Sequence, residues 1–148
     1  MKRSRVYLII GALLLCIILV ALAIVSRTRA VEAANVLAVE INSQALSSWD
    51  AALIVTNSEP SLLAQGGPDF FYTYFAALRR LGSLQEIDDI VFTMELPRLL
   101  LPASQGTASY TMNAVFTQGH AEIRITLMRR DGRWWFSEYL VLTPLMAS

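Results

Sequence analysis

The sequence has almost none of the side chains that bind metal ions or form disulfide bonds. Its 148 residues include one cysteine, Cys16, and one histidine, His120. A lone cysteine excludes an intrachain disulfide, and a metal site needs several converging histidine, cysteine or carboxylate groups. We therefore expect no bound metal and no cofactor. His120 follows a Gln118-Gly119 turn signal, so we expect a solvent-exposed side chain rather than a general base or a metal ligand.

The first 30 residues contain no acidic residue, and a 20-residue stretch within them contains no charged residue at all. The run Val6 to Val25 has no charge, no proline and a single glycine, Gly11. At 1.5 Å per residue, a helix of this length spans about 30 Å, the thickness of the bilayer's hydrocarbon core. The run predicts one transmembrane helix within residues 1–30. Its basic flanks are Lys2, Arg3, Arg5, Arg27 and Arg29.

The same segment also fits a cleaved secretory signal, because Ala21-Leu22-Ala23 could serve as its cleavage site. An uncleaved anchor is favoured, since the uncharged run continues to Ser26. More positive charge precedes the run than follows it, which predicts a cytoplasmic N-terminus. The remaining chain would then lie outside the cytoplasm, or in the periplasm of a cell with two membranes.

Basic residues are scarce in the rest of the chain, residues 31–148. This part has seven arginines, no lysine and all twelve acids, a net charge of −5. Phosphate neutralisation requires clustered cations, so nucleic acid is excluded as a partner. The length suits one compact domain with its own core.

The pattern of apolar residues predicts helices first and strands afterwards. Steps of three and four favour a helix over residues 31–57, with which the membrane helix can be continuous. A second helix is expected over residues 70–81, with Asp69 as its N-cap and Gly82 at its end. From residue 85 the apolar period changes to two, which predicts strands over residues 85–94, 107–117, 121–130 and 133–143.

Turn signals between the last three strands predict hairpins, the stronger at Asp131-Gly132. We therefore expect an α+β fold, with helices packed on one face of a curved four-stranded antiparallel sheet. In the last strand, simple alternation divides the apolar residues between two faces. Trp134, Phe136, Leu140 and Leu142 would share one face, and Trp135, Tyr139 and Val141 the other.

Two stretches resemble nuclear-transport-factor-2-like (cystatin-like cone) domains. The helix end at residues 74–82, with its Leu81-Gly82, is similar to theirs, and so is the closing hairpin at residues 119–136, where Asp131-Gly132 precedes tryptophan. The resemblance covers most of residues 35–143 and implies a cone-like α+β domain. Members include enzymes, ligand binders and dimerising scaffolds, and some anchored bacterial members belong to secretion or envelope assemblies. No catalytic set of the enzymatic members matches this chain residue by residue.

Four acids near the first strand, Glu86, Asp88, Asp89 and Glu95, are candidates for paired carboxylates. Adjacent strand residues point to opposite faces, and no histidine accompanies those that share a face. We expect a solvated strand edge. Asp89 is the one acid that the alternation can turn inward, where burial would raise its pKa.

An aromatic outer face of the sheet is the best candidate for a partner-binding surface. Its residues would be Trp135, Tyr139, Val141, Met128 and Arg124, unless the first helix or the Leu99–Leu101 loop covers them. The arginines at the last hairpin, Arg129, Arg130 and Arg133, would be solvated or would bind an acidic partner or lipid headgroups.

We therefore expect a single-pass membrane protein that is not an enzyme and that acts as a binding or scaffolding module in an envelope assembly. Its partners would be the lipid bilayer and either another membrane or envelope protein or a second copy. One alternative is a small apolar ligand held in the cone by Phe71, Phe75, Tyr110, Phe116 and Trp134. A less favoured alternative is an enzyme with an acid in the same cavity.

Overall fold

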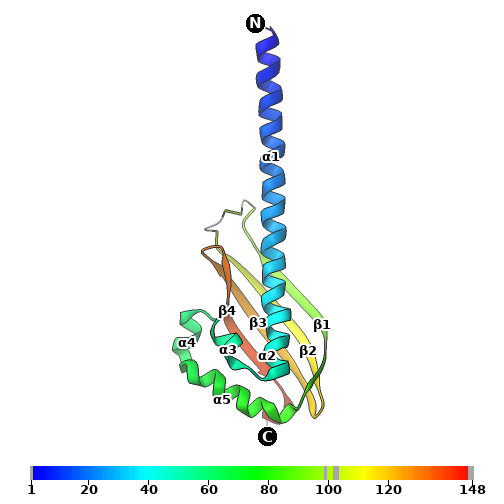
Figure 1. Ribbon diagram of the computed structural model, residues 1–148, viewed down its shortest axis with the longest axis vertical. Coiled ribbons are helices and arrows are strands. Elements are labelled where there is room, and N and C mark those ends of the chain that lie inside the picture. The colour runs from blue at the N-terminus through cyan, green and yellow to red at the C-terminus, as the bar shows by residue number, and fades with distance from the viewer. Residues whose placement is uncertain (1, 99, 102–103, 147–148) are drawn as a thin grey trace.

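A computed structural model describes residues 2–98, 100–101 and 104–146 and shows an α+β protein (Figure 1). Helices come first and a four-stranded antiparallel sheet follows. The helical elements are α1 (Lys2–Asn35), η1 (Val36–Ile41), α2 (Asn42–Ser48), α3 (Ala51–Val55), α4 (Pro60–Gly66), α5 (Pro68–Leu78), η2 (Arg79–Leu81) and, after the sheet, η3 (Pro144–Met146). The strands are β1 (Leu84–Glu95), β2 (Gly106–Phe116), β3 (Gly119–Arg130) and β4 (Arg133–Leu142).

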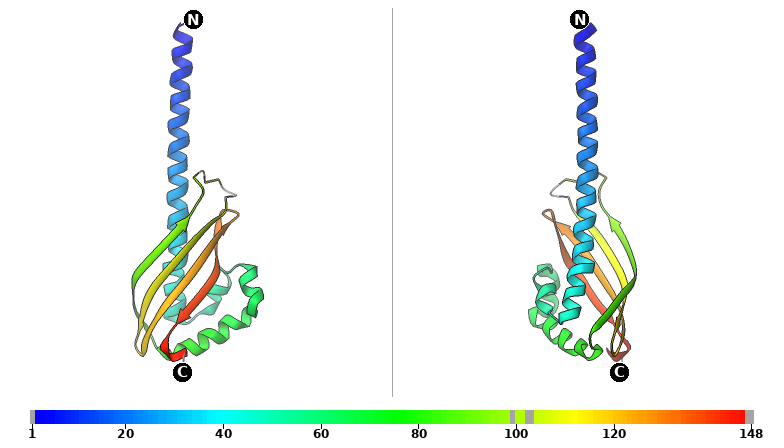
Figure 2. Two further views of the ribbon diagram at one scale, coloured as in Figure 1. Left: turned by 180° about the vertical axis from the view of Figure 1, so that it is seen from behind. Right: turned by 45° about the vertical axis from the view of Figure 1, so that its right-hand side comes forward.

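The apolar segment and the first part of the domain form one helix. α1, η1 and α2 run without interruption from Lys2 to Ser48, with a π-helical stretch at η1. The N-terminal part of α1 stands clear of the domain, whereas its C-terminal part and α2 lie along the sheet (Figures 1 and 2). In the described part of the chain, this is the one helix long and apolar enough to cross a membrane.

The expected helix over residues 31–57 is interrupted near its end. Trp49 adopts a left-handed backbone with φ 53°, which ends α2. The Asp50 carboxylate then accepts a hydrogen bond from the Ala52 N–H at 3.1 Å and caps the short α3. The chain therefore turns after Ser48 and leads through α4 to α5.

The helix expected over residues 70–81 forms as α5 and η2, with one error in its cap. Gly67 is the N-cap residue, and Asp69 lies inside the first turn, where a carboxylate still suits the helix dipole. Gly82 ends the helical segment as expected, with φ 84°. A Cβ at this position would collide with the Thr117 hydroxyl, so glycine is needed here for both conformation and space.

The strands pair in the order β1-β2-β3-β4, an antiparallel meander that forms a curved open sheet. Alternation correctly predicts which side chains of β2 and β3 face the helices. These buried side chains are Ala108, Tyr110, Met112, Ala114, Phe116, Ala121, Ile123, Ile125 and Leu127. The β3–β4 turn occurs at Asp131 and Gly132, both with positive φ, as in a tight hairpin.

In β4 the expected alternation holds only for the first half. Leu127 pairs with Phe136 and Thr126 with Glu138, so Ser137 is an extra residue, a β-bulge. The bulge exchanges the two faces beyond it. Tyr139 and Val141, expected outside, are buried at 6% and 3% exposure, and Leu140 and Leu142, expected inside, are 37% and 40% exposed.

A second irregularity bends the edge strand β1. Its pairing with β2 shifts between Asp88 and Val91, and Asp89 has φ 50°. Asp89 is exposed rather than turned inward, and its carboxylate accepts a hydrogen bond from the Asn113 amide at 3.2 Å. β1 therefore follows no simple alternation beyond the bulge.

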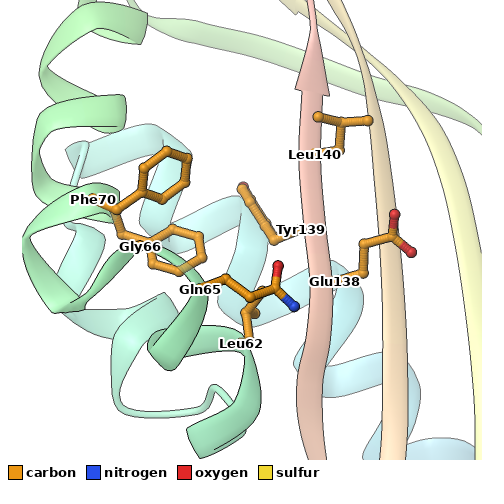
Figure 3. A pocket seen from close by; sticks show the side chains of 8 residues that line it. Leu62, Gln65, Gly66, Phe70, Glu138, Tyr139 and Leu140 are labelled. Carbon is orange, nitrogen blue, oxygen red and sulfur yellow. The ribbon is translucent and has the colours of Figure 1, made fainter.

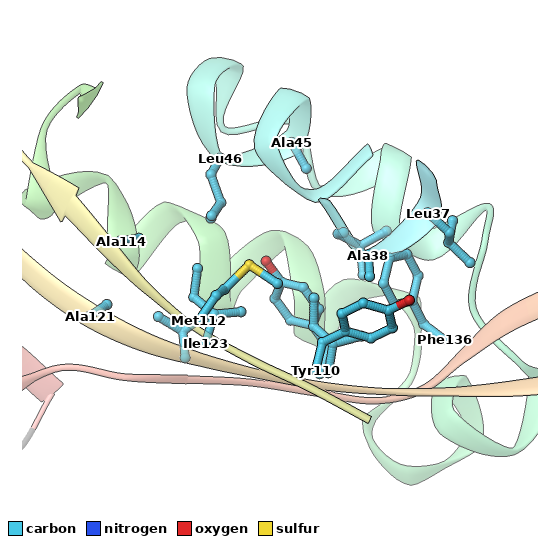
Figure 4. Close-up of a cluster of buried hydrophobic side chains, with 14 of the residues drawn as sticks. Leu37, Ala38, Ala45, Leu46, Tyr110, Met112, Ala114, Ala121, Ile123 and Phe136 are labelled. Carbon is cyan, nitrogen blue, oxygen red and sulfur yellow. The ribbon is translucent and has the colours of Figure 1, made fainter. Parts of the chain in front are cut away.

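One core joins the inner face of the sheet to the helices (Figure 4). The long helix contributes mostly small side chains to this core, which lets its backbone approach the sheet closely. Its fully buried apolar residues are Ala34, Ala38, Ala45 and Leu46. α5 covers the rest of the inner face with Phe71, Phe75 and Leu78.

Candidate functional site

The five residues expected to line a ligand cavity all lie in the packed core. Phe71, Phe75, Tyr110, Phe116 and Trp134 are each no more than 4% exposed. Neighbouring aromatic rings pack against four of them, Phe71, Phe75, Tyr110 and Phe116. The ring centroids of Trp49 and Phe116 lie 5.4 Å apart, those of Phe92 and Tyr110 5.6 Å apart, and those of Phe75 and Tyr139 6.0 Å apart.

Three of the five residues border surface hollows, and none of the main hollows in the described part of the chain joins two of them. Phe71 borders a cleft beside β4, Tyr110 a groove between α1 and β1, and Trp134 two hollows near the β3–β4 turn. The structure thus brings the five residues together as core, not around a common cavity.

A buried polar contact within this core escaped the sequence analysis. Asn42 is fully buried, and its carboxamide oxygen accepts a hydrogen bond from the Tyr139 hydroxyl at 2.5 Å. Its Nδ2 lies 3.6 Å from the Met112 sulfur. The sequence did contain a sign of this contact. Asn42 is a polar residue on the same helix face as Ala34, Ala38 and Ala45, where packing on the sheet requires apolar side chains.

Two further tyrosine hydroxyls form hydrogen bonds between elements that are distant in the chain. Tyr110 donates to the Asn35 carboxamide oxygen at 2.5 Å. Tyr74 donates to the Val141 carbonyl at 2.9 Å and accepts from the Val141 N–H at 3.0 Å. Burial raises the pKa of Tyr110 to about 12 and raises the pKa values of Tyr74 and Tyr139, so all three stay protonated at neutral pH.

No helix in the described part of the chain covers the outer face of the sheet (Figure 2). Of the five residues expected there, Trp135, Met128 and Arg124 lie on it. Trp135 pairs with Met128 across β3 and β4, and the Arg133 guanidinium carbon lies 3.9 Å from the Trp135 ring centroid. The Arg124 guanidinium contacts the Glu122 carboxylate at 2.6 Å.

Beyond the bulge, Leu140 and Leu142 take the outer positions that had been expected for Tyr139 and Val141. The centre of the face is polar, with Ser109, Thr111 and Thr126 beside the charged Glu122, Arg124 and Glu138. On this face, exposed apolar side chains lie along β4, one of the two edge strands, and also at Val91 of β1 and Val115 of β2. We define the "outer β4 surface" as Met128, Trp135, Leu140 and Leu142.

A cleft of about 320 Å³ lies between β4 and the helices α4 and α5 (Figure 3). Leu62, Phe70 and Leu140 are among its apolar walls, and Gln65 and Glu138 are polar. On both sides of this cleft, backbone groups at the free edge of β4 already form hydrogen bonds to other elements. The Glu59 N–H donates to the Phe136 carbonyl at 2.8 Å, and farther along the strand Tyr74 bonds to Val141.

Between these two hydrogen-bonded positions, the backbone of Tyr139 faces the cleft. In an antiparallel sheet, every second residue of a strand directs its backbone N–H and C=O to the same edge. The Val141 N–H and C=O point to the free edge of β4, where they contact Tyr74. The Tyr139 N–H and C=O therefore point to the same edge. The cleft thus combines apolar walls with one backbone donor and acceptor, a combination suited to a small amide or a single peptide unit.

At the end of the domain nearest the apolar helix, the β1–β2 loop and the β3–β4 turn are attached to α1. The Trp134 indole N–H donates to the Ala30 carbonyl at 2.9 Å, and Arg27 donates to the Pro97 carbonyl at 3.2 Å. Arg129, expected to be solvated, is only 7% exposed. Its guanidinium instead donates to the carbonyls of Leu101 and Ser104 at 3.2 and 2.8 Å.

The other residues of this end differ in exposure. Leu100 is buried and Leu101 is exposed, whereas Leu99 lies outside the described residues. Arg130 lies 3.5 Å from the buried Glu59 carboxylate, and Arg133 donates to the Asn57 carboxamide at 2.9 Å.

The candidate acid–base residues do not converge. His120 is exposed at the start of β3, and Glu86 and Glu95 are exposed on β1. Within residues 2–98, 100–101 and 104–146, no three histidine, cysteine, aspartate or glutamate residues are close enough together to hold a metal ion. Among the described residues, these particular candidates therefore do not form one acid–base site.

Comparison with known proteins adds no further assignment: the sequence matches no protein-family model and no curated protein at a significant level.

Proposed function

We propose that this chain is a single-pass membrane protein whose domain, on the far side of the membrane from the cytoplasm, is a non-enzymatic binding module. It would act as a subunit or scaffold of an envelope assembly and bind a protein partner of the same membrane through the outer β4 surface. One observation carries this proposal: the inner face of the sheet is filled by helices, while Leu140, Leu142 and Trp135 lie on a face that no described element covers.

The composition of this face supports protein contact. Aromatic residues, methionine and arginine are enriched at protein interfaces, and this face carries Trp135, Met128 and Arg124 beside Leu140 and Leu142. Burying Leu140, Leu142 and Trp135 against a partner would remove apolar area from water at about 25 cal/mol per Å². The N-terminal anchor would add to this by confining both partners to one plane.

The test is a pull-down of the full-length protein in gentle detergent, with mass spectrometry of the proteins that remain bound. We expect a stoichiometric membrane protein, or a second copy, to bind the wild-type chain and to be lost from Trp135→Glu and from Leu140→Asp. The matched control is Val36→Asp, which changes a residue of similar exposure on the helical side, at 43% against 37% for Leu140. Equal retention by all variants, each folded by circular dichroism, would contradict the proposed surface.

A small-molecule ligand is the second candidate function, because the cleft beside β4 presents the Tyr139 backbone between apolar walls. This location replaces the cone cavity expected from the sequence. Native mass spectrometry of the purified full-length chain should then detect a retained small molecule, and Leu62→Trp, which fills the cleft, should lose it. The wild-type chain without any such mass would count against this candidate.

Membership of the nuclear-transport-factor-2-like superfamily also remains a proposal. It is supported by the α+β layout, in which helices pack on one side of a curved antiparallel meander. The arrangement of the closing hairpin, with Trp134 directly after Asp131, Gly132 and Arg133, is the most specific part of the likeness.

A further inference from the structure

We propose that the α1-facing end of the domain is immersed in the outer leaflet of the bilayer, with phospholipid filling the hollow between α1 and the β1–β2 loop. This inference rests on the proposed membrane anchor and goes beyond it, because an anchor by itself requires no contact between the domain and lipid. The inference is based on the position of the β1–β2 loop, which lies beside the apolar part of α1.

The hollow has a volume of about 760 Å³ and lies partly beside the apolar run itself. Leu19, Leu22 and Val25 of α1 form one wall, and Leu100, Leu101 and Trp134 form the other. If residues 6–25 span the hydrocarbon core, Leu19 lies about 9 Å inside its outer boundary, at 1.5 Å per residue. The far wall of the hollow, which includes the 55%-exposed Leu101, then lies at the level of the acyl chains and headgroups.

The domain cannot swing away from this position without breaking its own structure. The helix is continuous from Lys2 to Ser48, so no flexible linker separates the apolar run from the core. Trp134 and Arg27 hold the turn and the loop to α1 through hydrogen bonds to backbone carbonyls. The depth of Leu101 is therefore set by the depth of α1.

The charges at this end match a phospholipid surface. The domain carries a net charge of −5, yet four of its seven arginines lie in the loop or at the β3–β4 turn, and Arg27 of α1 donates to the Pro97 carbonyl of that loop. Those four are Arg98, Arg129, Arg130 and Arg133. Arg29 and Arg129 also line the hollow beside its leucines. Arg29 beside an apolar wall that includes a tryptophan suits a phosphate headgroup above acyl chains, whereas Arg129 already donates to the Leu101 and Ser104 carbonyls.

Spin-label depth measurements on the full-length protein in phosphatidylethanolamine–phosphatidylglycerol vesicles test the immersion. Three single-cysteine sites are compared: native Cys16 in the apolar run, and Leu101→Cys and Gln118→Cys in a Cys16→Ala background. Gln118 lies in the β2–β3 turn, at the opposite end of the sheet. We expect labels at Cys16 and Leu101 to be more accessible to oxygen than to a water-soluble nickel complex, and the label at Gln118 to show the reverse.

The outcomes separate this inference from the anchor on which it rests. A lipid-exposed Cys16 label with a Leu101 label as accessible to nickel as that at Gln118 would keep the anchor and overturn the immersion. A nickel-accessible Cys16 label would overturn the anchor itself, and the immersion with it.

Retention of phosphatidylglycerol, measured by native mass spectrometry after transfer to detergent, tests the headgroup contact. Arg29→Gln should lower the retained lipid several-fold. Arg80→Gln, which removes an exposed arginine of η2, beside the β2–β3 turn at the opposite end of the sheet, should leave it unchanged. Equal retention by the two variants would refute a role of Arg29 in lipid binding.

Discussion

The two halves of the long helix are continuous, with a π-helical stretch at η1 in the second half, but differ in what surrounds them. Residues 6–25 are apolar on every side, and their large side chains are exposed in the structure. In residues 30–46, the buried apolar side chains face the sheet, and charged residues such as Glu32 and Glu40 are exposed. A helix surrounded by lipid has no polar side, whereas a helix packed on a sheet needs only one apolar stripe.

The difference also shows in side-chain size. The apolar run is rich in leucine, isoleucine and valine, which suit fluid lipid. The packed half uses Ala30, Ala34, Ala38 and Ala45 against the sheet, because small residues allow a close approach of the backbones. Four predictions follow the comparison of these halves, from the largest expected effect to the smallest.

Truncating one leucine in each half should separate their roles most clearly. Leu46→Ala removes a fully buried side chain and should lower the free energy of unfolding of the domain by about 2–5 kcal/mol. Leu15→Ala, in the exposed apolar run, should change it by less than about 0.5 kcal/mol. Denaturant titrations in detergent, followed by tryptophan fluorescence, would measure both. Equal effects would mean that the halves are not energetically distinct.

The polar exception on the packed face should matter next. Asn42→Ala leaves the Tyr139 hydroxyl without its acceptor and should cost about 1–3 kcal/mol of unfolding free energy. Gln44→Ala, at an exposed position two residues away, is the control. In a double-mutant cycle with Tyr139→Phe, the two losses should be less than additive. Full additivity would show that the hydrogen bond contributes nothing.

Alkaline pH should weaken the packed half and spare the apolar run. The folded-state pKa of Tyr139 is raised above the usual value of about 10, so the folded state keeps a proton that the unfolded state loses. Its contribution is complete below pH 10 and is lost as pH rises above it, by about 1.4 kcal/mol per pH unit. Unfolding free energies from pH 8 to 11 would show this fall, and Tyr139→Phe should reduce its slope.

The smallest effect is expected within the packed half but on its outward face. Val36 is 43% exposed on η1, so Val36→Ala should change the unfolding free energy by no more than about 0.5 kcal/mol. The same titration as for Leu46→Ala measures it. A loss comparable to that of Leu46→Ala would mean that the whole circumference of the helix is packed, and not one face.

Prediction from the sequence succeeded wherever one local rule governed a whole element. The apolar run, the glycine after the second helix, the hairpin at Asp131-Gly132 and the inward residues of β2 and β3 all follow from periodicity or turn chemistry. It was wrong where a single residue altered the register. Ser137 forms a bulge, which moves Tyr139 and Val141 into the core and brings Leu140 and Leu142 out. A bulge carries no composition signal of its own.

The candidate sites depended still more on contacts between distant parts of the chain. The five aromatic residues assigned to a cavity were correctly identified as interior, but whether an interior is hollow depends on what fills it. Here Trp49 and Tyr139 supply the filling rings. The burial of Arg129 depends on carbonyls of the β1–β2 loop, 25 and 28 residues away along the chain.

The sequence alone determined that a helix long and apolar enough to span a bilayer precedes an α+β domain, because helix length and strand period are local properties of the chain. Only the tertiary structure decided that the helix continues as the packing partner of the sheet, that the inner face is full, and that leucines of a distant loop lie beside the apolar run. These features arise from long-range packing, in which residues such as Ala30 and Trp134, 104 positions apart, come into contact.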